Sequence, residues 1–170
     1  MVGNPNPLPL AGMVVLDLSQ ILAGPVCGMM LADMGADVIK VEKPDGGDDN
    51  RRAGPPFIGG QGAGFMAANR NKRSLALNLR DESGRQVFER LLEQADVVVE
   101  NFRAGVMDRR GLGAAAMTQA NPRLVYLSLP GFASDDPRTT VPAWEGILGA
   151  ATATYRPRPV DGLPRADTIQ

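Results

Sequence analysis

The stretch "MVVLDLSQILAGPVCGMMLADMGADVIKVE", residues 13–42, decides the fold of this chain. It opens and closes with short apolar runs rich in Val and Ile, residues 13–18 and 36–42, and such runs predict buried strands. Between them, Pro25 suits the first turn of a helix and Gly35 suits its C-terminal stop. A strand, a helix and a strand within about 30 residues predict a right-handed βαβ unit with two parallel strands.

The same alternation continues along the chain. "RSLALNL" (73–79), "SGRQVFERLLEQA" (83–95) and "DVVVE" (96–100) predict a second βαβ unit, in which Val87, Phe88, Leu91 and Leu92 share one helical face. A short helix at 114–121 and a fifth strand at 123–129 follow. These elements predict a doubly wound parallel sheet of the α/β class, with ligands at the carboxyl ends of its strands.

The segment between residues 43 and 64 differs from the rest because it is rich in Gly, Pro, Asp and Arg. A loop of that length is more often functional than idle, although it could also be a mobile insertion. Its "GGQGAG" (59–64) matches neither a dinucleotide-binding motif nor a P-loop, and no predicted strand precedes it. A flexible loop is therefore the expectation.

Composition excludes several classes of function. The net charge of -1 over 170 residues does not favour a nucleic acid partner, and no apolar stretch approaches the length of a membrane span. The N-terminus resembles no signal peptide, and a single cysteine, Cys27, fits a reducing cytoplasm. The absence of histidine removes imidazole bases and histidine metal ligands, so chemistry falls to carboxylates, Lys, Ser, Tyr or Cys27. Cys27 itself is expected to be a small buried residue.

Three loops could contact an anionic ligand. "ILAGPVC" (21–27) is expected between the first strand and helix, where free N–H groups collect, although a plain connection is equally compatible. "NRNKRS" (69–74) carries three positive charges, which could bind a phosphate or form a solvated face. "VVVENFRAGVMDRRG" (97–111) combines Phe102 with three arginines near a strand end, which suits a ligand with an aromatic base and phosphates; Phe102 could equally be core.

The ordered blocks "LAGMVVLDLSQILAGPVCGMMLADMGADVIKVEKPDGGDD", "AANRNKRSLALNL", "ADVVVENFRAGVMDRRGLG" and "NPRLVYLSLPGF" resemble those of the family III CoA-transferases. That family includes formyl-CoA and carnitine CoA-transferases and the related α-methylacyl-CoA racemases. The resemblance covers most of residues 10–150. It implies a transferase with a Rossmann-like large domain, acyl-CoA and a carboxylate acceptor as substrates, no metal, and a homodimer of interlocked subunits.

The resemblance also implies roles for individual residues. Glu145 matches the position of a family aspartate and would attack the thioester, giving an acyl-enzyme anhydride and free CoA thiolate. The chain departs from the family pattern at two positions. Glu145 is one methylene longer than the family aspartate, and Gly149 stands where the family has a glutamine. From the residues alone, Glu145 is a first-turn helix acid next to Trp144. The positions expected to bind CoA are Leu22, Ala23, Lys43, Lys72, Asn101, Phe102, Arg103 and Arg109.

Two other functions stay open beside CoA transfer. The racemase branch needs a histidine where this chain has Trp144, although Asp167 lies near the second acid of that branch. A CoA-binding fragment without catalysis is the other alternative. Residues 1–170 are expected to form the N-terminal part of the large domain, without the small domain and the C-terminal return that complete the interlocked fold.

Overall fold

The computed structural model describes residues 8–154, 156–157 and 164–165. The chain divides into two compact units, one ending at Leu129 and the other beginning at Pro130. The first unit contains the sheet and all of the loops that the sequence singles out as ligand-binding. The assignment of the whole chain to one large domain stays a prediction.

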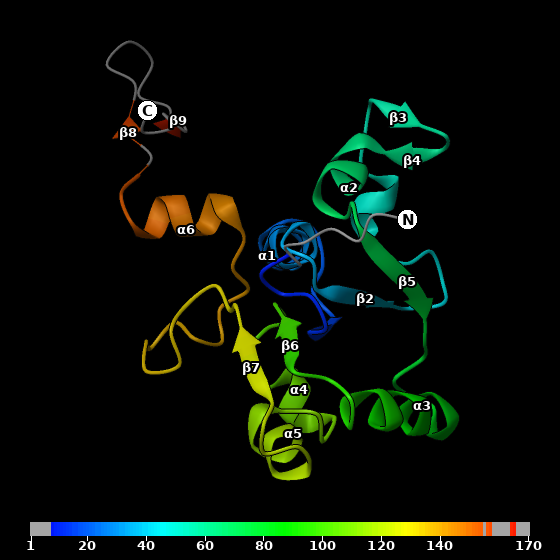
Figure 1. Cartoon of the computed structure of the whole chain (residues 1–170). Coiled ribbons are helices and arrows are strands. Elements are labelled where there is room, and N and C mark those ends of the chain that lie inside the picture. The colour runs from blue at the N-terminus through cyan, green and yellow to red at the C-terminus, as the bar shows by residue number, and fades with distance from the viewer. Residues whose placement is uncertain (1–7, 155, 158–163, 166–170) are drawn as a thin grey trace. The chain divides into compact units, whose positions relative to one another are not determined.

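The first unit is built on five parallel strands, and their order confirms the predicted doubly wound sheet (Figure 1). The order runs β5-β2-β1-β6-β7, so successive strands are added on one side of β1 and then on the other. A crevice for a ligand is expected where that direction reverses, between the carboxyl ends of β1 and β6. The strands are β1 (Val14–Asp17), β2 (Asp37–Glu42), β5 (Lys72–Ala76), β6 (Val97–Glu100) and β7 (Val125–Ser128).

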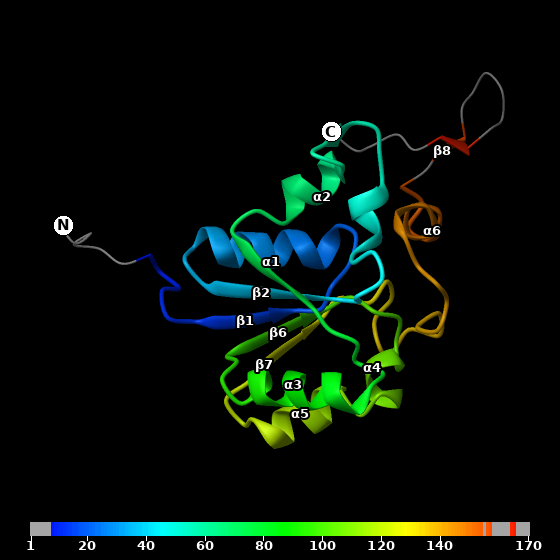
Figure 2. The same cartoon turned by 90° about the vertical axis from the view of Figure 1, so that its right-hand side faces the viewer.

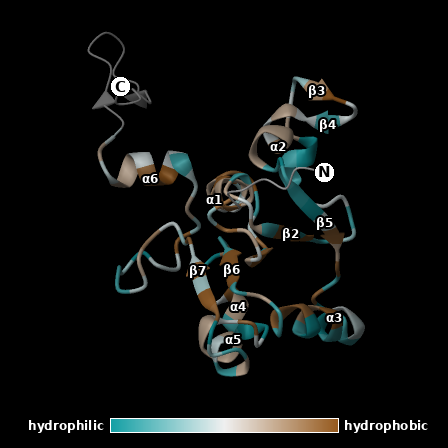
Figure 3. Ribbon diagram, viewed as in Figure 1, coloured by the Kyte–Doolittle hydropathy of each residue, from teal (hydrophilic) through white to brown (hydrophobic). Residues whose placement is uncertain are grey.

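Helices cover both faces of the sheet (Figure 2). Helix α1 (Ala23–Asp33) lies on one face, with the short α2 (Ala63–Ala68) beyond it. Helices α3 (Glu82–Leu92), α4 (Val106–Arg109) and α5 (Ala114–Ala120) lie on the other. Because both faces are covered, β1 and β6 are apolar at every position except their last, as Figure 3 shows for β6.

Each face of the sheet has its own hydrophobic core. Leu16, Val98 and Phe88 belong to the larger cluster, which is covered by α3, α4 and α5. Val15 and Val99 belong to the smaller cluster under α1. The predicted apolar face of α3 is confirmed for Phe88 and Leu92, which are buried, and for Leu91, which is partly buried; it is wrong for Val87, which is exposed because it lies outside the strip that meets the sheet.

The segment from 43 to 64 has more local structure than the sequence predicts. It contains a 3-10 helix η1 (Asp49–Arg52) and a small hairpin of β3 (Phe57–Ile58) and β4 (Gln61–Gly62). Gly59 and Gly60 form the hairpin turn with positive φ angles, a geometry that glycine adopts without strain. The expectation of a flexible "GGQGAG" loop is therefore wrong, because its glycines are used in a tight turn and the start of α2.

The second unit contains helix α6 (Glu145–Ala151) and a pair of two-residue strands, β8 (Arg156–Pro157) and β9 (Pro164–Arg165). Among the residues that the structure describes, none of the helices has the length and apolar character needed to cross a membrane.

Candidate functional site

The loops that follow β1 and β6 meet at the point where the strand order reverses. The side-chain amide of Asn101 accepts a hydrogen bond from the backbone N–H of Gln20 at 2.8 Å and donates one to the Gln20 carbonyl, also at 2.8 Å. Asn101 thus satisfies both polar groups of one residue in the neighbouring loop. The carboxyl edge of the sheet is thereby fixed where a ligand is expected.

A cavity of about 340 Å³ opens beside this junction. Its lining comes from the ends of four strands, β1, β2, β5 and β6, so residues far apart in the sequence meet there. The lining combines apolar side chains with three cations and two acids, notably Leu18, Leu79, Phe102, Lys43, Arg80, Arg110, Glu42 and Asp45. The Arg110 guanidinium lies 5.8 Å from the centre of the Phe102 ring. An aromatic surface beside several positive charges suits a flat base that carries phosphates.

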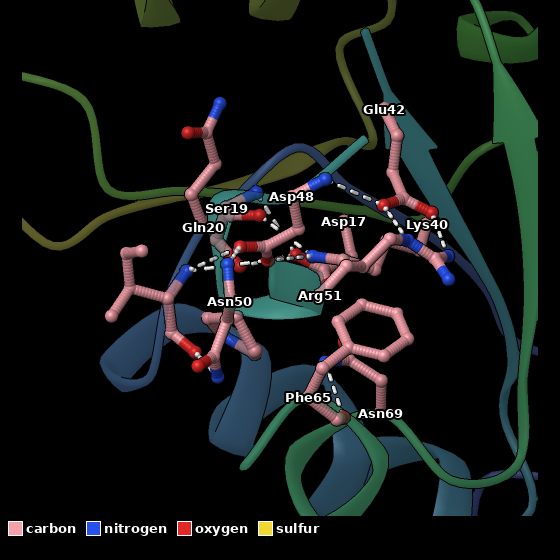
Figure 4. A network of polar contacts seen from close by, with 12 residues as sticks. Asp17, Ser19, Gln20, Lys40, Glu42, Asp48, Asn50, Arg51, Phe65 and Asn69 are labelled. Carbon is pink, nitrogen blue, oxygen red and sulfur yellow. Dashed lines mark hydrogen bonds and ion pairs between the residues drawn. The ribbon is translucent and has the colours of Figure 1, made fainter. Parts of the chain in front are cut away.

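Buried charged residues form ion pairs beneath the loops at the carboxyl ends of the strands (Figure 4). Lys72 pairs with Asp17 at 2.8 Å, and the two side chains are 2% and 0% exposed. Lys40 pairs with Asp48 at 3.1 Å and donates to the Ser19 carbonyl at 2.8 Å. Because buried charges are costly unless they are paired and hydrogen-bonded, these residues rigidify the strand ends.

Lys72 has a different place from the one that the family resemblance implies. Its ammonium donates to Asp17, to the Pro25 carbonyl and to Asn69, all at 2.7–2.8 Å, which uses its three N–H groups. Burial lowers the pKa of Lys72, and the charge of Asp17 opposes that shift. Helix α1 can lie close to this pair because Gly28 has no side chain; a methyl group there would come within 2.8 Å of an Asp17 oxygen. Lys72 in this arrangement stabilises the fold and has no N–H left for a phosphate.

Glu42 at the end of β2 is the acid of a third ion pair, which is partly buried. Arg51 donates to it through Nε at 2.8 Å and Nη2 at 2.5 Å, and the Ser74 hydroxyl and Asp48 N–H donate at 2.8 Å each. Burial works to raise the pKa of Glu42, but these hydrogen bonds outweigh it and lower the pKa to about 2. The Arg51 guanidinium also stacks 3.8 Å from the centre of the Phe65 ring, which ties α2 to the same place.

The lowered pKa of Glu42 predicts acid sensitivity. The folded pKa of about 2 lies below the value of 4.5 for an unperturbed glutamate, so Glu42 contributes stability above pH 4.5 that is lost as the pH falls towards 2. The contribution is at most about 3 kcal/mol. Urea unfolding from pH 7 to pH 2.5 should show a smaller loss of stability for Glu42→Gln than for the wild type, whereas Glu89→Gln, an exposed change on α3, should leave the wild-type slope. Equal slopes for the Glu42 variant and the wild type would contradict the assignment.

The other expected binding residues are spread around the junction. Phe102 lines the cavity, and Lys43 lines it while pairing with Asp49 at 2.6 Å. Leu22 and Ala23 are exposed at the start of α1, and Arg103 is exposed in the loop after β6. Arg109 is exposed on α4 and is not among the residues that line the cavity. Their contacts with CoA stay predictions.

Glu145 belongs to the second unit, whereas every residue named in the lining of the cavity belongs to the first. It is exposed and begins α6, which agrees with a first-turn helix acid, and Trp144 before it is 69% exposed. Its catalytic role stays a prediction. Asp167, the other acid considered from the sequence, lies outside the described residues.

Sequence reasoning missed two groups of residues at this site. Leu77, Leu79 and Arg80 line the cavity because they follow β5 at its carboxyl end, and Arg110 was noted only as a nearby charge. The position of Arg80 directly after a predicted strand was an available signal. Asp48 and Asn50, which hold the loop after β1, gave no signal because an acidic, glycine-rich loop looks like solvated surface.

Comparison with known proteins adds an independent observation. Residues 10–156 match the family described as CoA-transferase family III. The chain is 52% identical over 130 residues to a succinyl-CoA:mesaconate CoA-transferase from Haloarcula marismortui, covering 74% of this chain and 32% of that protein. It is 41% identical over 166 residues to a succinate–glutarate CoA-transferase from Agrobacterium fabrum, covering 92% of this chain and 41% of that one.

Solved structures show the same likeness. A hypothetical protein from Mycobacterium tuberculosis superimposes with a TM-score of 0.85 at 38% identity, covering 97% of this chain and 46% of that chain. The chain therefore spans less than half the length of each of these three proteins.

Proposed function

The chain belongs to CoA-transferase family III, and from this premise we propose that the protein moves CoA from an acyl-CoA to a free carboxylate. The observation that carries the proposal is the cavity at the carboxyl ends of β1, β2, β5 and β6, where Phe102 and three cations gather. CoA has an adenine base and several phosphate charges at one end, and that end fits an aromatic surface rimmed by Lys and Arg.

The nucleotide end of CoA is proposed to lie in this cavity, with Arg80, Arg110 and Lys43 facing its phosphates. The pantetheine arm would then run past the Gln20–Asn101 junction towards Leu22 and Ala23. Support for this direction comes from the junction itself, which lies at the strand-order reversal where ligands of such sheets bind.

Removal of a rim cation should weaken the nucleotide contacts selectively. Arg80→Ala is expected to raise the Kd for CoA about tenfold, because a charge-assisted contact with a phosphate is lost. The Kd for a pantetheine thioester, which lacks the nucleotide, should stay unchanged. The matched control is Arg123→Ala, an exposed arginine before β7 at the opposite edge of the sheet, which should leave both values unchanged. Calorimetry with each ligand checks this, and equal losses for both ligands would contradict the placement.

The chemistry proposed for Glu145 is nucleophilic. A carboxylate oxygen attacks the thioester carbonyl carbon, the C–S bond breaks, and CoA leaves as the thiolate while an acyl-enzyme anhydride forms. The thiolate then attacks the Glu145 carbonyl of the anhydride, which releases the donor carboxylate and leaves CoA as a thioester of Glu145. The acceptor carboxylate attacks this thioester and displaces the thiolate, and the thiolate attacks the acyl carbon of the new anhydride, which gives the acceptor acyl-CoA and regenerates the Glu145 carboxylate. The chain has no histidine, so a carboxylate is its main candidate for covalent acyl transfer.

The acyl groups are proposed to be short dicarboxylates. The names of the two curated relatives give succinate, mesaconate and glutarate, and each of these carries two carboxyl groups. The protein is further proposed to work as a homodimer, as the family resemblance implies, and to lie in the cytoplasm, which its single cysteine fits.

An exchange experiment tests the function. The full-length protein is incubated with succinyl-CoA and carbon-labelled mesaconate, glutarate or acetate, and label is measured in the CoA thioester. We expect label from the dicarboxylates and little from acetate. Label from acetate alone would overturn the substrate class, and absence of label with every acceptor would overturn CoA transfer.

A CoA-binding protein without transferase activity is the second candidate, and two residues favour it. The acid at position 145 is Glu, and position 149 is Gly where the family pattern has Gln. A shift of about 1 Å in a reacting group can lower a rate about 100-fold. Tight CoA binding in calorimetry without any exchange of label would select this candidate.

A further inference from the structure

The turn after β1 contains an unusual backbone conformation at Ile21. Its φ is 69°, in the left-handed region that β-branched residues avoid because their side chains clash with the backbone. The side chain is 50% exposed, so burial of apolar surface does not account for the conformation. Strained residues of this kind persist only where the surroundings determine them, and they concentrate at functional sites.

The strained turn is held from two sides. On one side, Asn101 from the loop after β6 binds the N–H and the carbonyl of Gln20, each at 2.8 Å. On the other side, both carboxylate oxygens of Asp48 accept from the Ile21 N–H, at 3.1 and 3.2 Å, and Asn50 Nδ2 donates to the Ile21 carbonyl at 2.9 Å. Two consecutive peptide residues thus have all four polar groups bound by side chains. Figure 4 shows Gln20, Asp48 and Asn50 in this network.

Asp48, Asn50 and Asn101, which bind the backbone of Gln20 and Ile21, are called the clamp, and the clamp is itself anchored in the sheet. Asp48 is 1% exposed, pairs with Lys40 on β2, and has its N–H bound by Glu42 at 2.8 Å. It also accepts from the Asn50 N–H at 2.9 Å, which fixes the start of η1. The position of the Ile21 peptide is therefore set by β2 on one side and by β6 on the other.

We propose that Asp48, Asn50 and Asn101 are positioning residues that preorganise the Leu22–Ala23 segment for CoA. This inference rests on the proposed function, because it takes the segment after Ile21 as part of the CoA site. The hydrogen bonds of the clamp offset the free-energy cost of the strained Ile21 backbone when the protein folds. The loop is therefore already ordered when the ligand binds. Loss of the clamp should therefore reduce the fraction of protein that is competent to bind, and the apparent affinity with it.

Two substitutions at Ile21 separate positioning from packing. Ile21→Ala removes the side chain and keeps a residue that is restricted at positive φ, whereas Ile21→Gly removes the same side chain and frees the backbone. We expect Ile21→Ala to have a KM for acyl-CoA roughly fivefold above that of Ile21→Gly, because alanine adopts the positive φ of the ordered turn less readily, with kcat within about twofold and an unchanged KM for the carboxylate acceptor. The Tm of the Gly variant should equal or exceed that of the Ala variant, because glycine relieves the strain.

Equal KM values for the two variants would overturn the inference, since only a side-chain contact would then matter. A lower Tm for the Gly variant with an unchanged KM would also overturn it, because the role would be purely structural.

Hydrogen exchange of the ligand-free, full-length protein tests the clamp apart from the function. The Gln20 and Ile21 amides should exchange slowly in the wild type and in Ile21→Gly, and at least tenfold faster in Asn101→Asp, in which the Gln20 carbonyl loses its donor. Unchanged exchange in Asn101→Asp would overturn the clamp. Absence of any CoA binding by the wild type would overturn the proposed function instead, so the two failures are distinguishable.

Discussion

Substitution of Glu145 by glutamine is expected to lower CoA transfer on the order of 10³-fold or more, with CoA affinity nearly unchanged. The amide of glutamine keeps the size of the side chain but cannot attack a thioester to form an anhydride. Steady-state kinetics of the full-length protein with succinyl-CoA and a dicarboxylate, together with calorimetric titration of CoA, measure the two quantities separately. Because Glu145 is exposed at the start of α6, the change should leave the Tm close to that of the wild type.

Asp167→Asn is the matched control, since it makes the same acid-to-amide change at the second acid that the sequence offers. We expect this variant to keep most of its transfer activity. Retained activity in Glu145→Gln combined with loss in Asp167→Asn would assign the nucleophile to Asp167 and leave Glu145 as a helix-start acid. A Glu145→Asp variant shows in addition whether the extra methylene places the acid well or badly, because it shortens the side chain to the family length.

Substitution of Lys72 by alanine is expected to destabilise the protein by about 3–5 kcal/mol, because it leaves the buried carboxylate of Asp17 without its partner. Arg73 follows it on β5 and pairs with Asp37, but those side chains are 65% and 48% exposed. Arg73→Ala should therefore change stability by less than about 1 kcal/mol. The two variants remove cations from adjacent positions of β5, and the main difference between them is that the Lys72 pair is buried and the Arg73 pair is exposed.

Urea unfolding of both variants measures this difference, and the Kd for CoA can be measured on the folded fraction. A small loss of stability in Lys72→Ala with a large loss of CoA affinity would contradict the structural role and restore Lys72 as a phosphate ligand. A large loss of stability with the Kd of the folded fraction preserved is the expected result.

The architecture of the sheet could be predicted from the sequence because its signals are local. Residues 13–42 alternate between apolar β-branched runs and a helix bounded by Pro25 and Gly35, and the structure has β1, α1 and β2 there. Hydrophobic periodicity also located α3 and β6. The hairpin at β3 and β4 was not predicted, because its two-residue strands are too short to show any period.

The candidate site was predictable only in part, because it depends on contacts between distant loops. Phe102 and Lys43 line the cavity, and they follow strands that the sequence shows clearly. Lys72 was assigned to the phosphates of CoA by the family resemblance, whereas its partner Asp17 lies 55 positions away along the chain. The binding of Ile21 by Asp48 similarly joins residues whose spacing carries no recognisable pattern.

The position of the adenine ring in a crystal structure of the full-length protein with CoA tests the central claim most directly. We expect the ring to lie in the cavity beside Phe102 and Leu79, with phosphates near Arg80 or Arg110. An adenine ring bound anywhere else, with the cavity free of ligand, would contradict it.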